Sequence, residues 1–273
     1  MMNDSSVAII GLGKMGSILL EAFIAKGLVT PELTRATVRH ADPERLRELR
    51  TRFGIEVGGD NAAAIRDADV ILLAVKPQSV KTVCAELAPV MKPGAWVISI
   101  AASVPTGFIE EALGEVPVVR AMPNTPCVIG QGMTGICRGR FTDDGHLQAT
   151  ETLFGAVGRT VTVDEKHMDA VTGLSASGPA FLYVILESLA EAGVKVGLPR
   201  DISTVLAAQT TAGAASMVLH TGKHPALLKD EVTTPAGCTI DGLLELEEGK
   251  IRVTLIKAIV KATERAGELV FSG

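Results

Sequence analysis

The sequence predicts an α/β protein in which a doubly wound, mostly parallel sheet is followed by an all-helical region. Three observations support this prediction. Short apolar runs alternate with helical patterns through the first half, a glycine-rich turn joins the first strand to the first helix, and helical spacing without strand signals fills the second half. The 273 residues suffice for two modest domains, because single domains usually run to roughly 100–200 residues. We place the boundary after Asp164, between residues 1–164 and 165–273.

The elements of the first half follow from apolar runs and helix-capping residues. The predicted strands cover residues 6–10, 34–38, 70–75, 96–101, 117–121 and 159–163, and the predicted helices cover 16–25, 44–53 and 80–90. Gly27 ends the first helix, while Asp42 is the expected N-cap and Pro43 the expected first residue of the second. Strands that alternate with helices imply a parallel sheet covered on both faces.

The second half has helical spacing and is rich in alanine. Breaks are expected at Gly178-Pro179, at residues 197–199, at residues 222–225 and at residues 234–237. Small side chains allow helices to pack closely, and roughly 110 residues is small for a free-standing core. We therefore expect a homodimer built on this half, with further association of dimers left open.

Composition excludes several classes of protein. A net charge of −5 provides no basic face for nucleic acid, and an aromatic content of 3% leaves few platforms for stacking bases. No metal is expected, because no metal-ligand spacing occurs among Cys84, Cys127, Cys137, Cys238 or among His40, His146, His167, His220 and His224. The N-terminus lacks a secretory pattern, and no apolar run approaches the roughly 20 residues that a membrane span needs. We therefore expect a soluble, cytoplasmic protein with reduced thiols.

The strongest local signal is the glycine-rich turn, which reads Gly11, Leu12, Gly13, Lys14, Met15, Gly16. It directly follows a predicted strand and opens a predicted helix, which is the context that supports a Rossmann-type dinucleotide site. Gly11 would permit the tight turn, Gly13 would let the backbone approach a pyrophosphate, and Gly16 would let helix and strand pack closely. The alternative is a turn that serves sheet packing alone.

The end of the second strand indicates which nicotinamide cofactor is bound. Proteins that bind NAD usually carry an acidic residue there, whereas this strand ends in Arg39 and His40. The nearest acid, Asp42, is better explained as the helix cap. Arg39 is thus the candidate for a 2′-phosphate contact, with His40 second, and NADPH is favoured over NADH. The alternative, that Arg39 is a solvated loop charge, stays open.

Two further loops follow strands at the edge where open α/β sheets bind ligands. One contains Ala74, Val75, Lys76, Pro77 and Gln78, and the other runs over residues 122–126 around Asn124. Asn124 could orient the nicotinamide ring or the substrate, or hold its own turn through side-chain hydrogen bonds. A lysine such as Lys76 is more often a surface residue than a catalytic one, and the pattern alone does not decide between the two.

In the helical half, residues 233–239 lead into a helix predicted from about Ile240. The amides of Gly237, Cys238 and Thr239 would form a helix N-terminus suited to a carboxylate. Capping by the Thr239 side chain is the alternative, and it is compatible with anion binding. Small residues at 175–180 would allow either close approach of a ligand or a packed helix kink.

Taken in order, these motifs resemble the pyrroline-5-carboxylate reductase family over nearly the whole chain. The segments that carry the resemblance are Gly11–Gly16, Ala74–Gln78, Met122–Pro126, Ser175–Ala180 and Leu228–Leu243. The last is the most specific. The chain departs from the family pattern at Ala176, Ala236 and Cys238, where the family has glycine, glycine and another small residue.

The resemblance implies NADPH-dependent reduction of 1-pyrroline-5-carboxylate to L-proline, with NADH as an alternative hydride donor. It implies that amides at Gly237, Cys238 and Thr239, helped by Thr234, bind the substrate carboxylate. The Thr239 hydroxyl would hydrogen-bond the imine nitrogen and act as the catalytic group. The helical halves of two subunits would interlock, with the site between them.

Three alternatives remain at this point. The chain could reduce another cyclic imine, or act on a β-hydroxyacid through a lysine such as Lys195. It could also bind NADPH as a regulatory protein without turnover.

Overall fold

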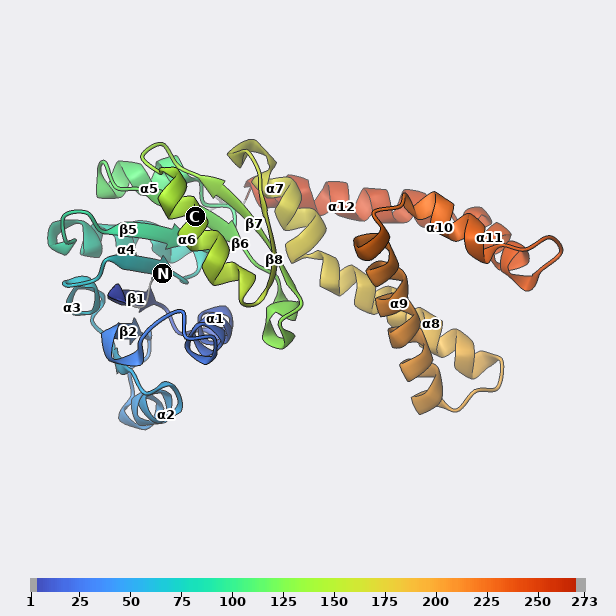
Figure 1. Ribbon diagram of the computed structural model, residues 1–273, viewed down its shortest axis with the longest axis horizontal. Coiled ribbons are helices and arrows are strands. Elements are labelled where there is room, and N and C mark those ends of the chain that lie inside the picture. The colour runs from blue at the N-terminus through green and yellow to red at the C-terminus, as the bar shows by residue number, and fades with distance from the viewer. Residues whose placement is uncertain (1–3, 269–273) are drawn as a thin grey trace. The chain divides into compact units, whose positions relative to one another are not determined.

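The computed structural model describes residues 4–268 and divides into two compact units (Figure 1). The first unit contains the residues up to Ser177 together with the end of the last helix from Lys261, and the second spans Gly178–Val260. The boundary expected after Asp164 stays a prediction.

The first unit is built on one sheet. Its strands are β1 (Val7–Ile10), β2 (Thr34–Thr37), β3 (Glu56–Gly58), β4 (Val70–Leu73), β5 (Trp96–Ser99), β6 (Val118–Met122), β7 (Gly132–Arg138) and β8 (Gly158–Thr162). They lie in the order β3-β2-β1-β4-β5-β6-β7-β8. All neighbours pair in parallel except β6 and β7, so the predicted mostly parallel sheet is confirmed.

Helices cover both faces of this sheet. They are α1 (Lys14–Ala25), α2 (Pro43–Phe53), α3 (Asn61–Ile65), α4 (Val80–Leu87), α5 (Thr106–Leu113), α6 (Asp144–Gly155) and α7 (Met168–Val171). Shorter 3-10 turns are η2 (Pro31–Leu33), η3 (Pro77–Ser79), η4 (Ala88–Val90), η5 (Thr125–Ile129) and η6 (Glu165–His167). The capping prediction for α2 is confirmed, because the Asp42 side chain accepts the Arg45 amide and Pro43 is the first helical residue.

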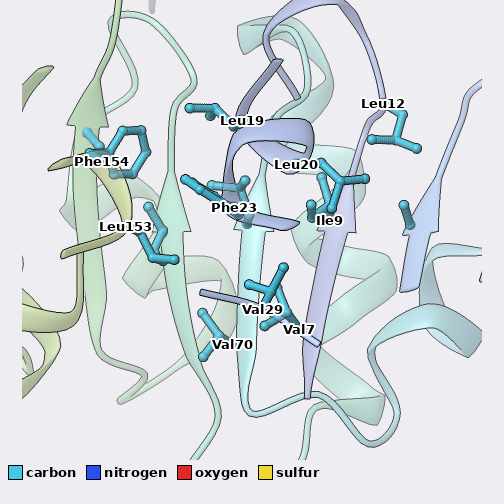
Figure 2. Packing of buried hydrophobic residues seen from close by; sticks show 14 of the residues in the cluster. Val7, Ile9, Leu12, Leu19, Leu20, Phe23, Val29, Val70, Leu153 and Phe154 are labelled. Atoms are coloured by element: carbon cyan, nitrogen blue, oxygen red, sulfur yellow. The ribbon is translucent and has the colours of Figure 1, made fainter. Parts of the chain in front are cut away.

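Two hydrophobic clusters form the core, one on each face. Residues of α1, α2 and α6 pack in the first, and residues of α3, α4 and α5 in the second, with alternate strand residues pointing to each. Figure 2 shows the first cluster, where Phe23 of α1 and Phe154 of α6 approach the strands. Their ring centroids lie 6.1 Å apart in an edge-to-face arrangement. The doubly wound prediction is therefore confirmed.

Several elements differ from expectation. Sequence reasoning missed β3, β7, α3, α5 and α6. Strands predicted to reach residues 75 and 101 end at Leu73 and Ser99 in the structure, because the residues that follow leave the sheet as loops. The helix expected over 80–90 ends at Leu87 and continues as η4, where Pro89 cannot supply an amide hydrogen.

The second half is helical, as predicted. A π-helical turn, η7 (Thr172–Ala176), leads into α8 (Gly178–Lys195), followed by α9 (Arg200–Thr221), α10 (Pro225–Val232), α11 (Cys238–Glu248) and α12 (Ile251–Glu268). Breaks occur as expected at 197–199, 222–225 and 234–237. Near the break expected at Gly178-Pro179, the α-helix is interrupted just upstream by η7 and the bend at Ser177, and α8 begins at Gly178. Pro179 lies in the first turn of α8, where a missing amide hydrogen costs little.

The second unit has little core of its own. Within Gly178–Val260 only Ala190 and Ser203 are buried, whereas large apolar side chains such as Val184, Val205 and Leu244 are exposed. Two helical runs, Glu165–Lys195 and Arg200–Thr221, are long and apolar enough to pass a length-and-composition test for a membrane span, which sequence reasoning did not anticipate. Exposed apolar surface of this kind is typical of a protein-protein or membrane interaction site.

Candidate functional site

The glycine-rich turn has the geometry that close backbone packing requires. Gly11 has a φ of +104°, and a Cβ placed there would lie 2.8 Å from the carbonyl oxygen of Ala74. A Cβ on Gly16 would lie 2.4 Å from the Gly11 carbonyl oxygen. At Gly13 a Cβ would meet nothing within 4 Å, so that face of the turn is open. Gly11 and Gly16 thus allow close packing of the backbone, whereas Gly13 leaves room for a ligand.

This open face belongs to a cavity of about 830 Å³ at the carboxyl ends of the strands, which we call the strand-end cavity. It is lined by Gly11, Leu12, Gly13, Thr37, Val38, Arg39, His40, Arg45, Gly59, Asn61, Ala74, Val75, Lys76, Gln78, Ser79, Thr82, Val83 and Glu86. Its walls come from the glycine turn, the end of β2, the end of β4 and one face of α4. This volume falls in the range typical of small-molecule sites.

The structure brings most predicted cofactor residues to this cavity. Eight of them line it: Gly11, Leu12, Gly13, Arg39, His40, Ala74, Val75 and Lys76. Lys14, Met15 and Gly16 lie in the first turn of α1, and Pro77 opens η3. Met15 packs against the core instead. Sequence reasoning missed Thr37, Arg45, Asn61 and the α4 residues, because their approach to the turn depends on tertiary structure.

The cavity fits a nicotinamide dinucleotide. The open position at Gly13, at the N-terminus of α1, allows a pyrophosphate to approach backbone amides. The end of β2 presents Arg39 and His40, and Glu86 is the one carboxylate among the lining residues. Its oxygen already accepts a hydrogen bond from Asn61 Nδ2 at 2.7 Å. This charge pattern suits an anionic ligand.

Asn124 lies away from the strand-end cavity, in the loop after β6. Its Oδ1 accepts the Met133 amide at 2.9 Å, and its Nδ2 donates to the Ser175 carbonyl at 3.2 Å. The side chain therefore ties the start of β7 to the π-helical turn η7. One N–H donor and one oxygen lone pair of the amide are used in this way, which agrees with the turn-holding alternative raised from the sequence.

In the second unit, the turn before α11 is built around Thr234 and Gly237. The Gly237 amide donates to the Thr234 carbonyl at 3.1 Å, and a Cβ on Gly237 would lie 2.5 Å from Thr234 Oγ1. Gly237 is the N-cap of α11 and has no side-chain cap, so the Thr239 capping alternative is wrong. Because the Gly237 amide is occupied, the free donors are the first two helical amides, those of Cys238 and Thr239.

Ala236 adopts a left-handed conformation in the same turn, with a φ of +56°. Glycine would adopt this left-handed conformation without steric strain, whereas the Cβ of alanine makes it strained. Alanine stands at position 236 where the family has glycine, and the turn is still formed with a left-handed residue at that position.

A buried ion-pair group also escaped sequence reasoning. The Arg120 side chain in β6 is only 4% exposed, and its guanidinium lies 3.7 Å from Glu165 Oε1 and 3.5 Å from Asp169 Oδ1. Glu165 also accepts hydrogen bonds from the amide and hydroxyl of Thr106. The group joins β6, α5 and the start of the helical run, and a single arginine inside a strand pattern was its only sequence signal.

The cysteines and histidines form no metal site. Burial raises the pKa of Cys84 to about 11 and that of Cys137 to about 12, while Cys238 is exposed. His146 completes the capping box of α6, whose N-cap is Asp143, and His224 is the N-cap of α10. Over residues 4–268 no group of three His, Cys, Asp or Glu side chains could hold a metal ion.

Comparison with known proteins places the chain in one family. The family described as pyrroline-5-carboxylate reductase dimerisation matches residues 165–269, and NADP oxidoreductase, coenzyme F420-dependent, matches residues 6–103. The pyrroline-5-carboxylate reductase of Methanosarcina acetivorans is 44% identical over 98% of this chain and 99% of its own length. That of Glycine max is 42% identical over 97% of this chain and 96% of its own length.

Solved structures agree. A pyrroline-5-carboxylate reductase from Coxiella burnetii superposes with a TM-score of 0.90 at 36% identity, covering 98% of this chain and 99% of the other. A pyrroline carboxylate reductase from Plasmodium falciparum, solved with NADP bound, gives a TM-score of 0.88 at 29% identity, covering 99% of this chain and 100% of the other. The glycine turn, the strand-end cavity and the turn before α11 therefore belong to a member of the pyrroline-5-carboxylate reductase family.

Proposed function

We propose that the protein reduces 1-pyrroline-5-carboxylate to L-proline with NADPH, the last step of proline biosynthesis. The observation that carries this proposal is the turn from Thr234 to Thr239, in which two free helix amides stand beside a threonine hydroxyl. Full-length relatives with this activity in their names, 44% and 42% identical, support it. The same relatives leave no support for a β-hydroxyacid dehydrogenase acting through Lys195, which lies at the exposed end of α8.

The strand-end cavity is the proposed NADPH site. Gly11, Leu12 and Gly13 would line the pyrophosphate site. The Leu12 amide already donates to the Thr37 carbonyl at 2.8 Å, so the donors would be the first amides of α1, those of Lys14, Met15 and Gly16. Arg39 and His40 would face the 2′-phosphate. Ala74, Val75, Lys76 and Pro77 would form the wall on the β4 side. When bound, the cofactor supplies a hydride, and NADH would do so with weaker binding.

Asn124 would act by positioning. Because its amide already binds Met133 and Ser175, its contribution to cofactor binding would be to fix η7 and the start of β7. We propose this role beside the predicted contact with the nicotinamide, for which the second Nδ2 hydrogen remains available.

The turn before α11 is the proposed substrate site. The substrate carboxylate would accept hydrogen bonds from the Cys238 and Thr239 amides, where the helix dipole also favours an anion. Thr234 and Gly237 would shape the turn, since the Thr234 side chain lies over Gly237. The Thr239 hydroxyl would hydrogen-bond the imine nitrogen and hold its proton. An iminium that arrives protonated needs no separate acid, so positioning would supply much of the catalysis.

We further propose that a second copy of the chain covers the apolar helices of the second unit. The match of residues 165–269 to a dimerisation family supports this, and so does the near absence of buried residues within 178–260. A homodimer would bury the faces of α8 and α9 that otherwise resemble membrane spans. We propose a soluble, cytoplasmic enzyme without a nucleic-acid or membrane partner, with domains 1–164 and 165–273.

A steady-state assay with two variants tests the function. Wild-type protein should oxidise NADPH on addition of pyrroline-5-carboxylate. Thr239→Val keeps the shape but removes the hydroxyl, so we expect kcat to fall about 100-fold, as for the loss of one preorganised hydrogen bond at the reacting centre. Thr239→Ser should retain most activity. Equal activity of all three proteins would exclude the proposed role of the hydroxyl, and no turnover by the wild type would exclude the function.

A further inference from the structure

Arg45 lines the strand-end cavity in addition to Arg39, and it belongs to none of the cofactor motifs found in the sequence. Arg45 lies in the first turn of α2, four residues before Leu49 and eight before Phe53, the two buried residues of that helix. Residues at this spacing share one helix face. Arg45 is exposed, lies on the same helix face as these two residues, and lines the cavity together with Arg39 and His40.

The arginines of β2 and α2 fall into two groups. Arg35 pairs with Asp67, Arg50 donates to the Val57 carbonyl, and Arg52 pairs with Glu21. No such side-chain partner is found among residues 4–268 for Arg39, Arg45 or Arg47. Of these three, only Arg39 and Arg45 line the cavity. Two arginines whose side chains have no partner among the described residues thus line the same cavity.

Two carboxylates close to Arg45 in the sequence or in the cavity, those of Asp42 and Glu86, already accept hydrogen bonds from other groups. The Asp42 carboxylate accepts the Arg45 backbone amide at 2.9 Å as the helix cap and leaves the guanidinium unbound. Glu86, on the α4 wall of the cavity, is bonded by Asn61. A phosphate monoester carries between one and two negative charges near neutral pH, so a single arginine would neutralise it only in part.

We propose that Arg45 is a specificity-determining residue that binds the 2′-phosphate of NADPH together with Arg39. The inference rests on the proposed function for the identity of the cofactor, and it assigns cofactor choice to α2 as well as to the end of β2. Two guanidinium groups give a phosphate dianion charge balance and several directed hydrogen bonds. NADH lacks that phosphate, so its binding would not use Arg45.

Equilibrium binding tests this assignment without turnover. Calorimetric titration of NADP⁺ and NAD⁺ into the wild type, Arg45→Ala and Arg47→Ala gives six dissociation constants. We expect Arg45→Ala to weaken NADP⁺ binding about tenfold, as for a lost charge-assisted hydrogen bond, and NAD⁺ binding less than about twofold. Arg47→Ala, on the same helix but outside the cavity, should change neither.

A misfolded Arg45→Ala variant would also bind NADP⁺ weakly, so a second variant and a salt series are added to the test. Arg45→Lys keeps the charge but loses the planar fork, so its NADP⁺ affinity should fall between those of the wild type and Arg45→Ala. Raising the salt concentration should reduce the preference for NADP⁺ more in the wild type than in Arg45→Ala, because salt screens exposed charges.

Equal weakening of both nucleotides, or unchanged NADP⁺ affinity in Arg45→Ala, would overturn the assignment. These outcomes are separate from failure of the proposed function, which would appear as a wild type that binds NADP⁺ and leaves pyrroline-5-carboxylate unreduced.

Discussion

The two helix N-termini that we propose as the cofactor and substrate sites are supported in different ways. The first, at α1, is packed on a sheet, and glycine occupies the position with a φ of +104°. The second, at α11, follows a turn in which alanine has a φ of +56°, within a unit that has almost no core of its own. The proposed cofactor site therefore lies in a unit with its own core, whereas the proposed substrate site lies in a unit that, in our proposal, a second copy of the chain covers. The variants below test this difference, from the largest expected effect to the smallest.

Gly16→Ala should cause the largest loss. A Cβ there would lie 2.4 Å from the Gly11 carbonyl oxygen, and backbone cannot move aside as a side chain can. We expect a loss of about 3 kcal/mol in the free energy of unfolding, measured by urea denaturation. Gly13→Ala is the matched control, since its Cβ meets nothing within 4 Å. It should keep its stability but bind NADP⁺ more weakly, and equal destabilisation by both changes would contradict this reading of the turn.

The thermal midpoint should depend on protein concentration. If a second copy covers α8 and α9, dilution shifts the equilibrium towards unfolded chains. A hundredfold increase in concentration corresponds to about 2.7 kcal/mol, which should raise the midpoint by several degrees. Calorimetry at several concentrations checks this. A midpoint that does not move over that range would show that the second unit is stable without a partner.

Alkaline pH should destabilise the first unit through its buried thiols. The folded pKa values of Cys84 and Cys137, about 11 and about 12, lie above the ordinary thiol value. Unfolded thiols therefore lose protons first as the pH rises above about 9, and stability falls until the folded values are passed. The loss should be on the order of 2 kcal/mol for Cys84. Cys84→Ala should flatten the decline between pH 9 and 11 in urea titrations; an unchanged slope would contradict the assignment.

Cys238 should behave differently, because it is exposed at the N-terminus of α11. At pH 8, iodoacetamide should modify Cys238 before the three buried cysteines, as mass spectrometry of peptides would show. Modification should reduce activity, since the adduct stands beside the proposed carboxylate site, and added proline should slow it. Cys238→Ala keeps the backbone amide and should retain activity while resisting the reagent.

Ala236→Gly should have the smallest effect. It relieves left-handed strain but increases the entropy of the unfolded chain, and the two contributions are of similar size. We expect a change within about 1 kcal/mol in the free energy of unfolding. Ala236→Val should lose more, because a branched side chain tolerates a positive φ poorly. If the valine variant were as stable as the wild type, the turn would not depend on this conformation.

Local sequence signals predicted much of the fold and part of the site. Asp42 and Pro43 correctly marked the start of α2, and the glycine motif marked the turn that opens the strand-end cavity. Strand β7 was missed because glycine interrupts its apolar pattern for reasons of packing. A Cβ on Gly132 would meet Cys127 Sγ, and one on Gly135 would lie 2.5 Å from Val171.

The rest of the site depends on contacts between distant segments. Arg45 and Asn61 reach the cavity only because α2 and α3 pack beside the ends of β2 and β3, and neither carries a motif. The Gly237 amide looked free in the sequence but bonds the Thr234 carbonyl three residues earlier. Sequence patterns therefore identified the segments that form the candidate sites. Which backbone and side-chain atoms are free to bind a ligand there depends on tertiary contacts.

The most direct test of the central claim is the stoichiometry of the reaction. Purified protein is incubated with NADPH and pyrroline-5-carboxylate, the cofactor is followed by absorbance, and L-proline is measured by chromatography. One L-proline formed for each NADPH oxidised, with the rate lost in Thr239→Val, is the predicted result. Oxidation of NADPH without formation of proline, or no oxidation by the wild type, would contradict the account.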